Sequence, residues 1–320
     1  MRTRNKVGMQ VALLVAAAVG SLAQAAAPAE IIIPGEKLFT ESLTSAADGS
    51  VIIGSLGGRT IFRAKPGSGA AEAWIKPGTD GMQGIFGVFA DDKANTLWAC
   101  SGSFGPPGGA SPPSTLHAFD LKSGAPKGKY PLPTAGAFCN DAAVDSNGNV
   151  YATDTNNMEV VRLRKGGTAL EVWAGNGSFG PKGGILDGIA VLGKRVLVNT
   201  LGTSKLFSVA IDGDKAGAAA EVKLDRAIER PDGMRSFGTD SLLVVEGGGG
   251  GRLSRVTLNG DTGKTTTIKE GYADGPVAVT MVGTTAYVLE GQLAAMFGPP
   301  GGTPPAAKPF RATAVEVGKP

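Results

Sequence analysis

Short apolar segments separated by turn residues follow one another along most of the chain. The pattern is clearest between residues 141 and 175, where DAAVD, NVYATD, EVVRLR and ALEVWAG stand in succession. Each segment is short, rich in apolar and β-branched residues, and followed by Gly, Asn or Ser, which is typical of a strand and its turn. This part of the sequence predicts four consecutive strands of one antiparallel sheet.

The opening of this segment recurs at near-equal spacing. CNDAAVD at 139–145, LDGIAV at 186–191 and PDGMRSF at 231–237 each place Asp or Asn before an apolar strand. Six reference points can be aligned with separations of 46, 53, 47, 45 and 44 residues, namely Glu41, Gly87, Asn140, Asp187, Asp232 and Pro276. A second row of polar residues ends the next strand 12 or 14 residues later, at Ser55, Ser101, Asp154, Asn199, Glu246 and Glu290.

Repeats of about 40–50 residues that hold four strands each are typical of β-propeller blades. We therefore predict an all-β fold, a six-bladed β-propeller of four-stranded antiparallel blades over residues 38–318. The apolar segment at 31–33 has no partner in the first repeat. We expect it to form the outermost strand of the last blade beside FRATAVEV at 310–317, which would close the ring with both chain ends. A loose N-terminal arm is the alternative.

Composition agrees with a chain rich in strands and turns. It contains 50 Gly and 20 Pro in 320 residues, with 42% hydrophobic and 18% charged residues. The content of turn-forming Gly and Pro is too high for a helical protein, and the apolar content is sufficient for a hydrophobic core.

The N-terminus has the features of an export signal. Arg2, Arg4 and Lys6 precede an apolar run at 11–19, and Ala-Gln-Ala at 23–25 provides small residues for cleavage. We expect a signal peptide at 1–25 and a single mature domain at 26–320, periplasmic or secreted and free of the membrane. A membrane anchor is the alternative, but the run is shorter than the roughly 20 residues that a spanning helix needs.

Charge and scarce residues exclude several functions. Without the leader, 28 basic residues balance 28 acidic ones, and no Lys/Arg cluster suggests nucleic-acid binding. The single histidine, His117, lies in an apparent strand and rules out a multi-histidine metal site. Cys100 and Cys139 could form a disulfide if the fold brings them together, or could both be small buried hydrophobes.

The propeller gives the recurring acidic residues a common location. Residues that begin the innermost strands ring one mouth of the central channel, so Glu41, Asp187 and Asp232 would converge there with Asn140 between them. Clustered carboxylates repel one another unless a cation lies among them. We therefore predict one divalent cation, with calcium first and manganese, magnesium or zinc as alternatives. The competing interpretation is that these residues only cap turns. Asp154, Glu246 and Glu290 are expected to pair with turn amides.

Four motifs resemble landmarks of the regucalcin and gluconolactonase-like six-bladed propellers: LFTES with Glu41, CNDAAVDSNGNVYATD with Asn140 and Asp141, LDGIAV with Asp187, and RPDGM with Asp232. The resemblance covers essentially the whole mature chain. It implies a metal held by Glu41, Asp187 and Asp232, a substrate site at Asn140 and Asp141, and Asp232 as the general base in lactone hydrolysis. The reaction would need no histidine, since a Lewis-acid metal stabilises the developing oxyanion.

Two positions depart from that family. Asp187 stands where the family usually has asparagine, which adds a negative charge. Phe138 stands two places before Asn140, where sugar-lactone enzymes often have a basic residue. A more apolar ester, lactone or other ligand is therefore expected in place of a sugar lactone.

Two kinds of glycine-rich segment remain. EGGGGGRL at 246–253 lacks the Lys-Ser/Thr of a phosphate loop and is expected to be a turn. FGPPGGASPP at 104–113 and FGPPGGTPP at 297–305 predict long loops on matching sides of blades two and six, either lids over the channel or surface insertions.

Three functions follow from the sequence. The first is an exported, metal-dependent hydrolase of a lactone or ester that takes a small molecule at the channel mouth. The second is a non-catalytic ligand- or protein-binding propeller of the NHL type. The third is a scaffold with a structural metal. The acidic residues favour the first over the second, and fold alone cannot choose among them.

Overall fold

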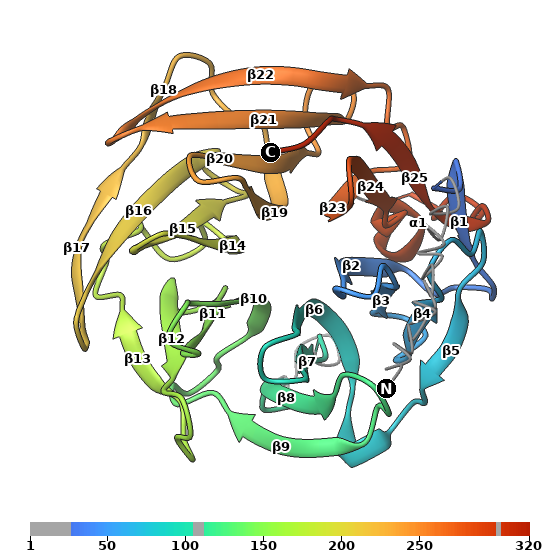
Figure 1. The fold of residues 1–320 in the computed structure, drawn as a ribbon, viewed down its shortest axis with the longest axis horizontal. Coiled ribbons are helices and arrows are strands. Elements are labelled where there is room, and N and C mark those ends of the chain that lie inside the picture. Colours follow the sequence, from blue (N-terminus) through green and yellow to red (C-terminus); the bar gives the residue numbers. More distant parts are fainter. Residues whose placement is uncertain (1–26, 105–111, 299–301) are drawn as a thin grey trace, which may run out of the picture.

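Six β-sheets stand in a ring around a central channel in the computed structural model, which describes residues 27–104, 112–298 and 302–320 (Figure 1). Each sheet runs from an inner strand near the axis to an outer strand at the rim. The predicted all-β, six-bladed propeller of antiparallel blades is confirmed. The predicted signal peptide at 1–25 lies outside the described residues.

The strands follow the sequence blade by blade. Blade 1 contains β2 (Thr40–Ser45), β3 (Val51–Ser55), β4 (Ile61–Ala64) and β5 (Glu72–Ile75); blade 2 contains β6 (Gly84–Asp91), β7 (Thr96–Gly102), β8 (Thr115–Asp120) and β9 (Pro126–Pro131); blade 3 contains β10 (Cys139–Val144), β11 (Val150–Asp154), β12 (Glu159–Leu163) and β13 (Glu171–Ala174).

The second half of the ring repeats the arrangement. Blade 4 contains β14 (Leu186–Leu192), β15 (Arg195–Thr200), β16 (Lys205–Asp212) and β17 (Lys215–Glu221); blade 5 contains β19 (Pro231–Phe237), β20 (Ser241–Glu246), β21 (Arg252–Asn259) and β22 (Thr262–Glu270), with β18 (Lys223–Leu224) parallel to β22; blade 6 contains β23 (Pro276–Val282), β24 (Thr285–Glu290), β25 (Phe310–Glu316) and β1 (Glu30–Ile33). A 3-10 turn, η1 (Thr79–Gly81), precedes blade 2, and helix α1 (Leu293–Phe297) follows β24.

The ring is closed by the N-terminal strand, as predicted. Strand β1 pairs antiparallel with β25, with Ile31 opposite Ala312 and Ile33 opposite Phe310. Ile31 and Ile33 are 2% and 1% exposed and pack in the core between blades 6 and 1. Burial of these two side chains excludes the loose-arm alternative and joins the first strand of the described chain to the last.

Apolar side chains fill the spaces between neighbouring blades. Ile52 and Ile61 of blade 1, for example, share one buried cluster with Ile85 and Leu97 of blade 2. Because each blade buries both of its faces against neighbours, its inner strands read as nearly continuous apolar runs. This packing explains why the strands lack strict alternation of apolar and polar residues.

The register between first and second strands refines the predicted rows. The second-strand residues that pair with the inner strand just before its register shift are Ser55, Ser101, Asp154, Thr200, Glu246 and Glu290. Thr200 therefore fills the place expected for Asn199, because Asn199 lies opposite the bulge formed by Asp187 and Gly188. Likewise, Phe86 and Val277, and not Gly87 and Pro276, occupy the positions equivalent to Glu41.

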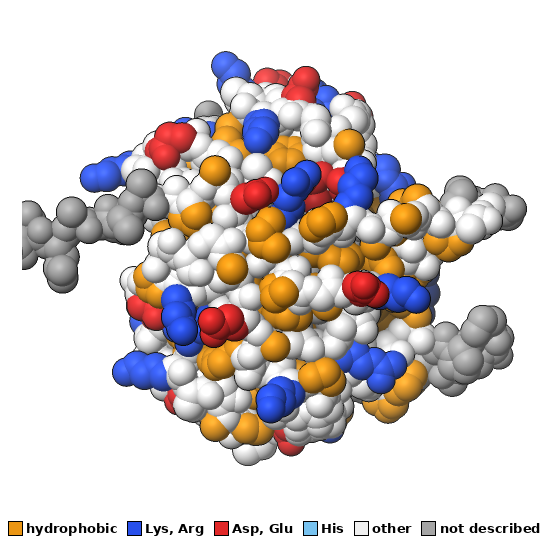
Figure 2. Space-filling view, turned by 90° about the vertical axis from the view of Figure 1, so that its right-hand side faces the viewer, with side chains coloured by type: hydrophobic (Ala, Val, Ile, Leu, Met, Phe, Trp, Pro, Cys, Tyr) orange, Lys and Arg blue, Asp and Glu red, His pale blue; other side chains and the backbone are white. Residues whose placement is uncertain are grey.

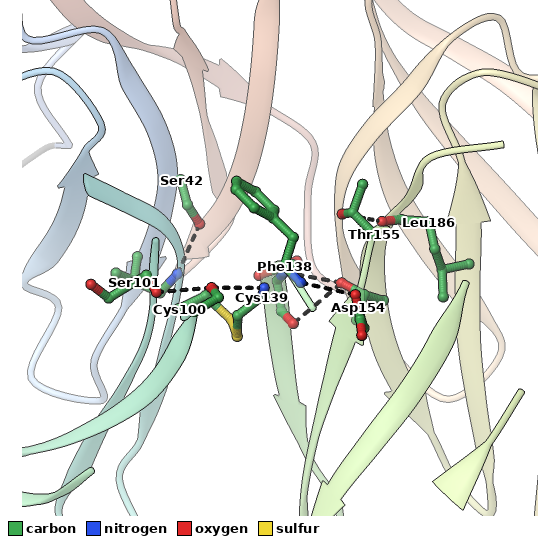
Figure 3. The surroundings of a disulfide bond; sticks show 12 residues. Ser42, Cys100, Ser101, Phe138, Cys139, Asp154, Thr155 and Leu186 are labelled. Carbon is green, nitrogen blue, oxygen red and sulfur yellow. Dashed lines mark hydrogen bonds between the residues drawn. A yellow bond between two sulfur atoms is a disulfide. The ribbon is translucent and has the colours of Figure 1, made fainter. Parts of the chain in front are cut away.

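A disulfide joins blades 2 and 3 beside the channel mouth (Figure 3). Cys100 of β7 and Cys139 of β10 are both fully buried, with their Cα atoms 5.2 Å apart. The bond holds the first residue of β10 against the neighbouring blade, directly before Asn140. Of the two possibilities left open for the cysteines, the disulfide is confirmed.

Replacing both cysteines by alanine is expected to lower the free energy of unfolding by about 2 kcal/mol. The disulfide restricts the conformations of the unfolded chain, and the double variant lacks that restriction. Urea unfolding followed by tryptophan fluorescence measures the change. Reductant should destabilise the wild type and leave the double variant unchanged; a wild type indifferent to reductant under unfolding conditions would contradict the prediction.

Figure 2 shows one side of the molecule, around β1 and β5, where basic and acidic side chains are interspersed. Within the residues that the structure describes, no helix is long and apolar enough to cross a membrane.

Candidate functional site at the channel mouth

A β-bulge at the start of each inner strand sets the direction of the predicted site residues. In blade 4, Leu186 pairs with Thr200 and Ile189 pairs with Val198, so that Asp187 and its following glycine oppose a single residue. A bulge of this kind leaves an extra residue unpaired and redirects its side chain. The bulged positions of the six blades form one row: Glu41, Phe86, Asn140, Asp187, Asp232 and Val277.

The glycine that follows the acid in blades 4 and 5 is required by close approach of neighbouring inner strands. A Cβ on Gly188 would lie 2.5 Å from the carbonyl oxygen of Asp232, and one on Gly233 would lie 2.7 Å from that of Val277. Both distances are too short for a side chain. The Asp-Gly pairs in the sequence therefore mark where the backbone converges on the channel.

Neighbouring blades also fix the backbone of the acidic residues. The hydroxyl of Thr153 in blade 3 donates to the carbonyl of Asp187 in blade 4 at 2.7 Å. The amide of Asn199 in blade 4 donates to the carbonyl of Asp232 in blade 5 at 2.6 Å, and its Oδ1 accepts from the N–H of Gly188 at 3.2 Å. These bonds tie the mouths of blades 3, 4 and 5 together.

The acidic side chains at the mouth lie close enough to interact electrostatically. Burial, followed by the charges of Asp187 and Asp141, raises the pKa of Glu41 well above its usual value. Burial and then Asp141 raise the pKa of Asp187 to about 8. Burial, then Asp187 and Glu41, raise the pKa of Asp232, opposed by a hydrogen bond from the N–H of Gly233. The structure therefore brings together the carboxylates that the sequence placed at one mouth.

Asp141 has a different environment from the other three carboxylates. It is 4% exposed and forms an ion pair with Arg235, whose Nη1 donates to its Oδ2 at 2.8 Å. Arg235 also donates to the carbonyl oxygens of Met234 at 2.8 Å, Val88 at 2.9 Å and Leu43 at 3.3 Å. One guanidinium thus connects the inner strands of blades 1, 2, 3 and 5 across the channel.

Arg235 is not among the predicted site residues, although its position carries a detectable signal. In the other inner strands the equivalent residues are Thr44, Phe89, Ala143, Ala190 and Thr280. A single arginine in this otherwise uncharged row, within DGMRSF, indicates a buried partner of opposite charge. Asp141, expected at the substrate site, is that partner.

The carboxylates that end the second strands bind turn amides, as predicted. Asp154 accepts from the backbone N–H of Phe138 at 2.9 Å, Glu246 from that of Glu229 at 2.7 Å, and Glu290 from that of Asp274 at 2.9 Å. Each fixes the loop that leads into the inner strand of its own blade.

The cation hypothesis can be tested against the donor atoms at the mouth. Across residues 27–104, 112–298 and 302–320, no three His, Cys, Asp or Glu side chains already form a set that could hold an ion. The donor chemistry nevertheless fits a hard cation: all the acidic groups offer oxygen, and within the described residues Glu41 Oε2 is buried without a hydrogen-bond partner. Assembly of a coordination sphere would require side-chain rearrangement.

A pocket of about 440 Å³ opens beside Asp232. Helix α1 and the segment at 305–308 line it opposite Val277 and Pro276. Gln292 accepts from the N–H of Lys308 at 2.7 Å, and the Lys308 ammonium lies 2.6 Å from Asp274. These contacts hold the outer wall of the pocket against blade 6.

The chain has structural neighbours but no match by sequence. No family model matches it, and no curated protein matches it. A virginiamycin B lyase from Staphylococcus aureus shares 16% identity over 82% of this chain and 80% of that one, with a TM-score of 0.60. An aldose sugar dehydrogenase from Streptomyces coelicolor, in its PQQ-bound form, shares 15% over 91% and 99%, with a TM-score of 0.58.

A gluconolactonase from Xanthomonas campestris shares 14% identity over 88% of this chain and 87% of that one, with a TM-score of 0.58. At such identities these likenesses show a common propeller fold and do not assign a function.

Proposed function

We propose that this protein is an exported hydrolase that depends on a divalent cation and acts on a lactone or ester. The observation that carries the proposal is the convergence of Glu41, Asp187 and Asp232 at one channel mouth, each with a raised pKa caused by burial and neighbouring carboxylates. Such a cluster is unfavourable when fully ionised unless a cation compensates it. The pocket beside Asp232 provides space for a small molecule.

The residues have separate proposed roles. Glu41, Asp187 and Asp232 would hold the cation, with calcium first because all the donors are oxygen atoms. When bound, the cation would supply positive charge that stabilises the oxyanion developing from the carbonyl. Asn140 would orient the substrate, with Asp141 fixed behind it by Arg235. Asp232, whose pKa is raised by burial and by the charges of Asp187 and Glu41, would accept the proton of the attacking water.

The structural neighbours share the propeller fold and do not select an activity. The gluconolactonase agrees with the resemblance seen in the sequence motifs, whereas the lyase and the dehydrogenase show that similar propellers are used for other chemistry. The alternative is a non-catalytic ligand- or protein-binding propeller with a structural metal.

Two experiments on the purified exported protein test the proposal. The first is a calcium titration measured by calorimetry. The second is a screen for hydrolysis of aliphatic lactones, sugar lactones and aryl esters in the presence of calcium, manganese or zinc. Asp232→Asn and Glu41→Gln should each weaken calcium binding by about tenfold or more, since even loss of a residue behind a metal ligand has an effect of this size. Both should abolish detectable hydrolysis.

The matched control is Asp261→Asn, which removes a carboxylate from an exposed turn between β21 and β22. It should retain wild-type binding and activity. Calcium binding without hydrolysis of any substrate would favour the scaffold interpretation, and hydrolysis that survives Asp232→Asn undiminished would refute the role given to Asp232.

A further inference from the structure

Four phenylalanine side chains form a connected group, the mouth aromatic cluster, defined as Phe86, Phe104, Phe138 and Phe297. The rings of Phe86 and Phe138 meet edge to face with centroids 4.5 Å apart. Phe104 stacks on Phe138 at 5.4 Å and meets Phe86 and Phe297 edge to face, each also at 5.4 Å. These separations and angles are those of favourable aromatic contacts.

Two members of the mouth aromatic cluster are open to solvent. Phe104 is 49% exposed and Phe297 is 55% exposed. Among the side chains that the structure describes, only Val172 joins them as an exposed large hydrophobic residue, at 43%. Phe104 and Phe297 begin the two similar FGPPGG segments of the sequence; the two side chains come after the second strands of blades 2 and 6 and contact each other. Exposed aromatic surface gathered from separate loops indicates a binding surface.

The mouth aromatic cluster is continuous with the acidic site. Phe86 occupies the same bulged row as Glu41 and Asp232, and Phe138 lies two residues before Asn140. Leu293 of α1 packs against the buried group that contains Phe86 and Phe138, and it also lines the pocket that contains Asp232. An apolar wall therefore runs from the two exposed rings to the proposed reacting centre.

We propose that the mouth aromatic cluster binds an aromatic ring carried by the substrate, which makes the substrate class an aryl ester or a ring-bearing lactone. This inference rests on the proposed function. Exposed rings at Phe104 and Phe297 can stack on a flat apolar group, and they offer no donors or acceptors to sugar hydroxyls. In hydrolysis of an aryl ester, the water oxygen bonds to the acyl carbon, the bond to the aryl oxygen breaks, and that oxygen takes a proton.

Two measurements on the exported protein separate ring binding from hydrolysis. The first is a fluorescence titration with 2-naphthol, which has the ring and no ester. The second compares kcat/KM for 2-naphthyl acetate and δ-valerolactone. Phe104→Ser and Phe297→Ser should each weaken naphthol binding and lower kcat/KM for the naphthyl ester about tenfold, and change kcat/KM for δ-valerolactone by less than about twofold. Val172→Ser, an exposed apolar residue on the outer strand of blade 3, is the matched control and should match the wild type.

The outcomes distinguish the two proposals. Naphthol binding that is lost in both phenylalanine variants and kept in Val172→Ser supports the aromatic site, even if no ester is hydrolysed and the proposed function fails. Hydrolysis of δ-valerolactone with no naphthol binding and no preference for the naphthyl ester overturns the aromatic site and leaves the proposed function standing. Equal losses in Val172→Ser would also overturn it.

Discussion

Replacing Arg235 by methionine is expected to lower the free energy of unfolding by about 3–5 kcal/mol, the usual effect of removing one partner of a buried ion pair. Methionine fills much of the same volume but leaves the carboxylate of Asp141, 4% exposed, without its cation. It also removes the guanidinium that donates to the carbonyls of Leu43 and Val88. The midpoint of urea unfolding and the melting temperature measure the loss.

Two further variants identify the cause of that loss. Asp141→Asn combined with Arg235→Met should recover part of the stability, because the uncompensated charge is removed together with the guanidinium. Arg311→Met, in an exposed pair with Glu30 at 3.8 Å, should change stability by no more than about 0.5 kcal/mol. A single Arg235→Met variant as stable as Arg311→Met would show that the channel does not depend on this ion pair.

The importance of Arg235 illustrates what a linear sequence can and cannot predict here. Blade number, strand order and the closure by β1 could be predicted, because turn residues and apolar runs are local patterns repeated at a regular period. The partner of Arg235 could not be found in this way. Asp141 lies two blades away, and the two side chains meet only after the ring has closed.

The detailed register was predicted less well for a related reason. Asn199 was expected in the row 12 residues after Asp187, whereas the register places Thr200 there and leaves Asn199 opposite the bulge at Asp187 and Gly188. Turn lengths and bulge forms differ between blades, so spacing along the sequence cannot place a residue to within one position even when the repeat is correct. The contacts within the mouth aromatic cluster could not be predicted for the same reason as the Arg235 ion pair, since its members come from blades 2, 3 and 6.

The cluster of carboxylates has a further consequence for stability. With divalent cations chelated, the melting temperature is expected to fall by about 5 °C or more between pH 5 and pH 8. The pKa of Asp187 is about 8 in the folded protein, against 3.8 for an ordinary aspartate. Between these values the folded state holds a proton that the unfolded state has lost, so stability decreases as pH rises through the window.

Adding calcium and substituting Asp187 test whether the acidic cluster causes the decrease in melting temperature. Saturating calcium should raise the melting temperature most at pH 8, because a bound cation compensates the charges that appear as the cluster ionises. Asp187→Asn should flatten the pH profile in chelator, since it removes the carboxyl group whose pKa is raised to about 8. Asp261→Asn, on an exposed turn, should keep the full decrease. Scanning calorimetry in chelator and in calcium gives all of these comparisons. A wild-type melting temperature that stays constant in chelator, or that rises toward pH 8, would show that the protein itself compensates the three carboxylates. The physical reason for expecting a cation at the mouth would then be lost.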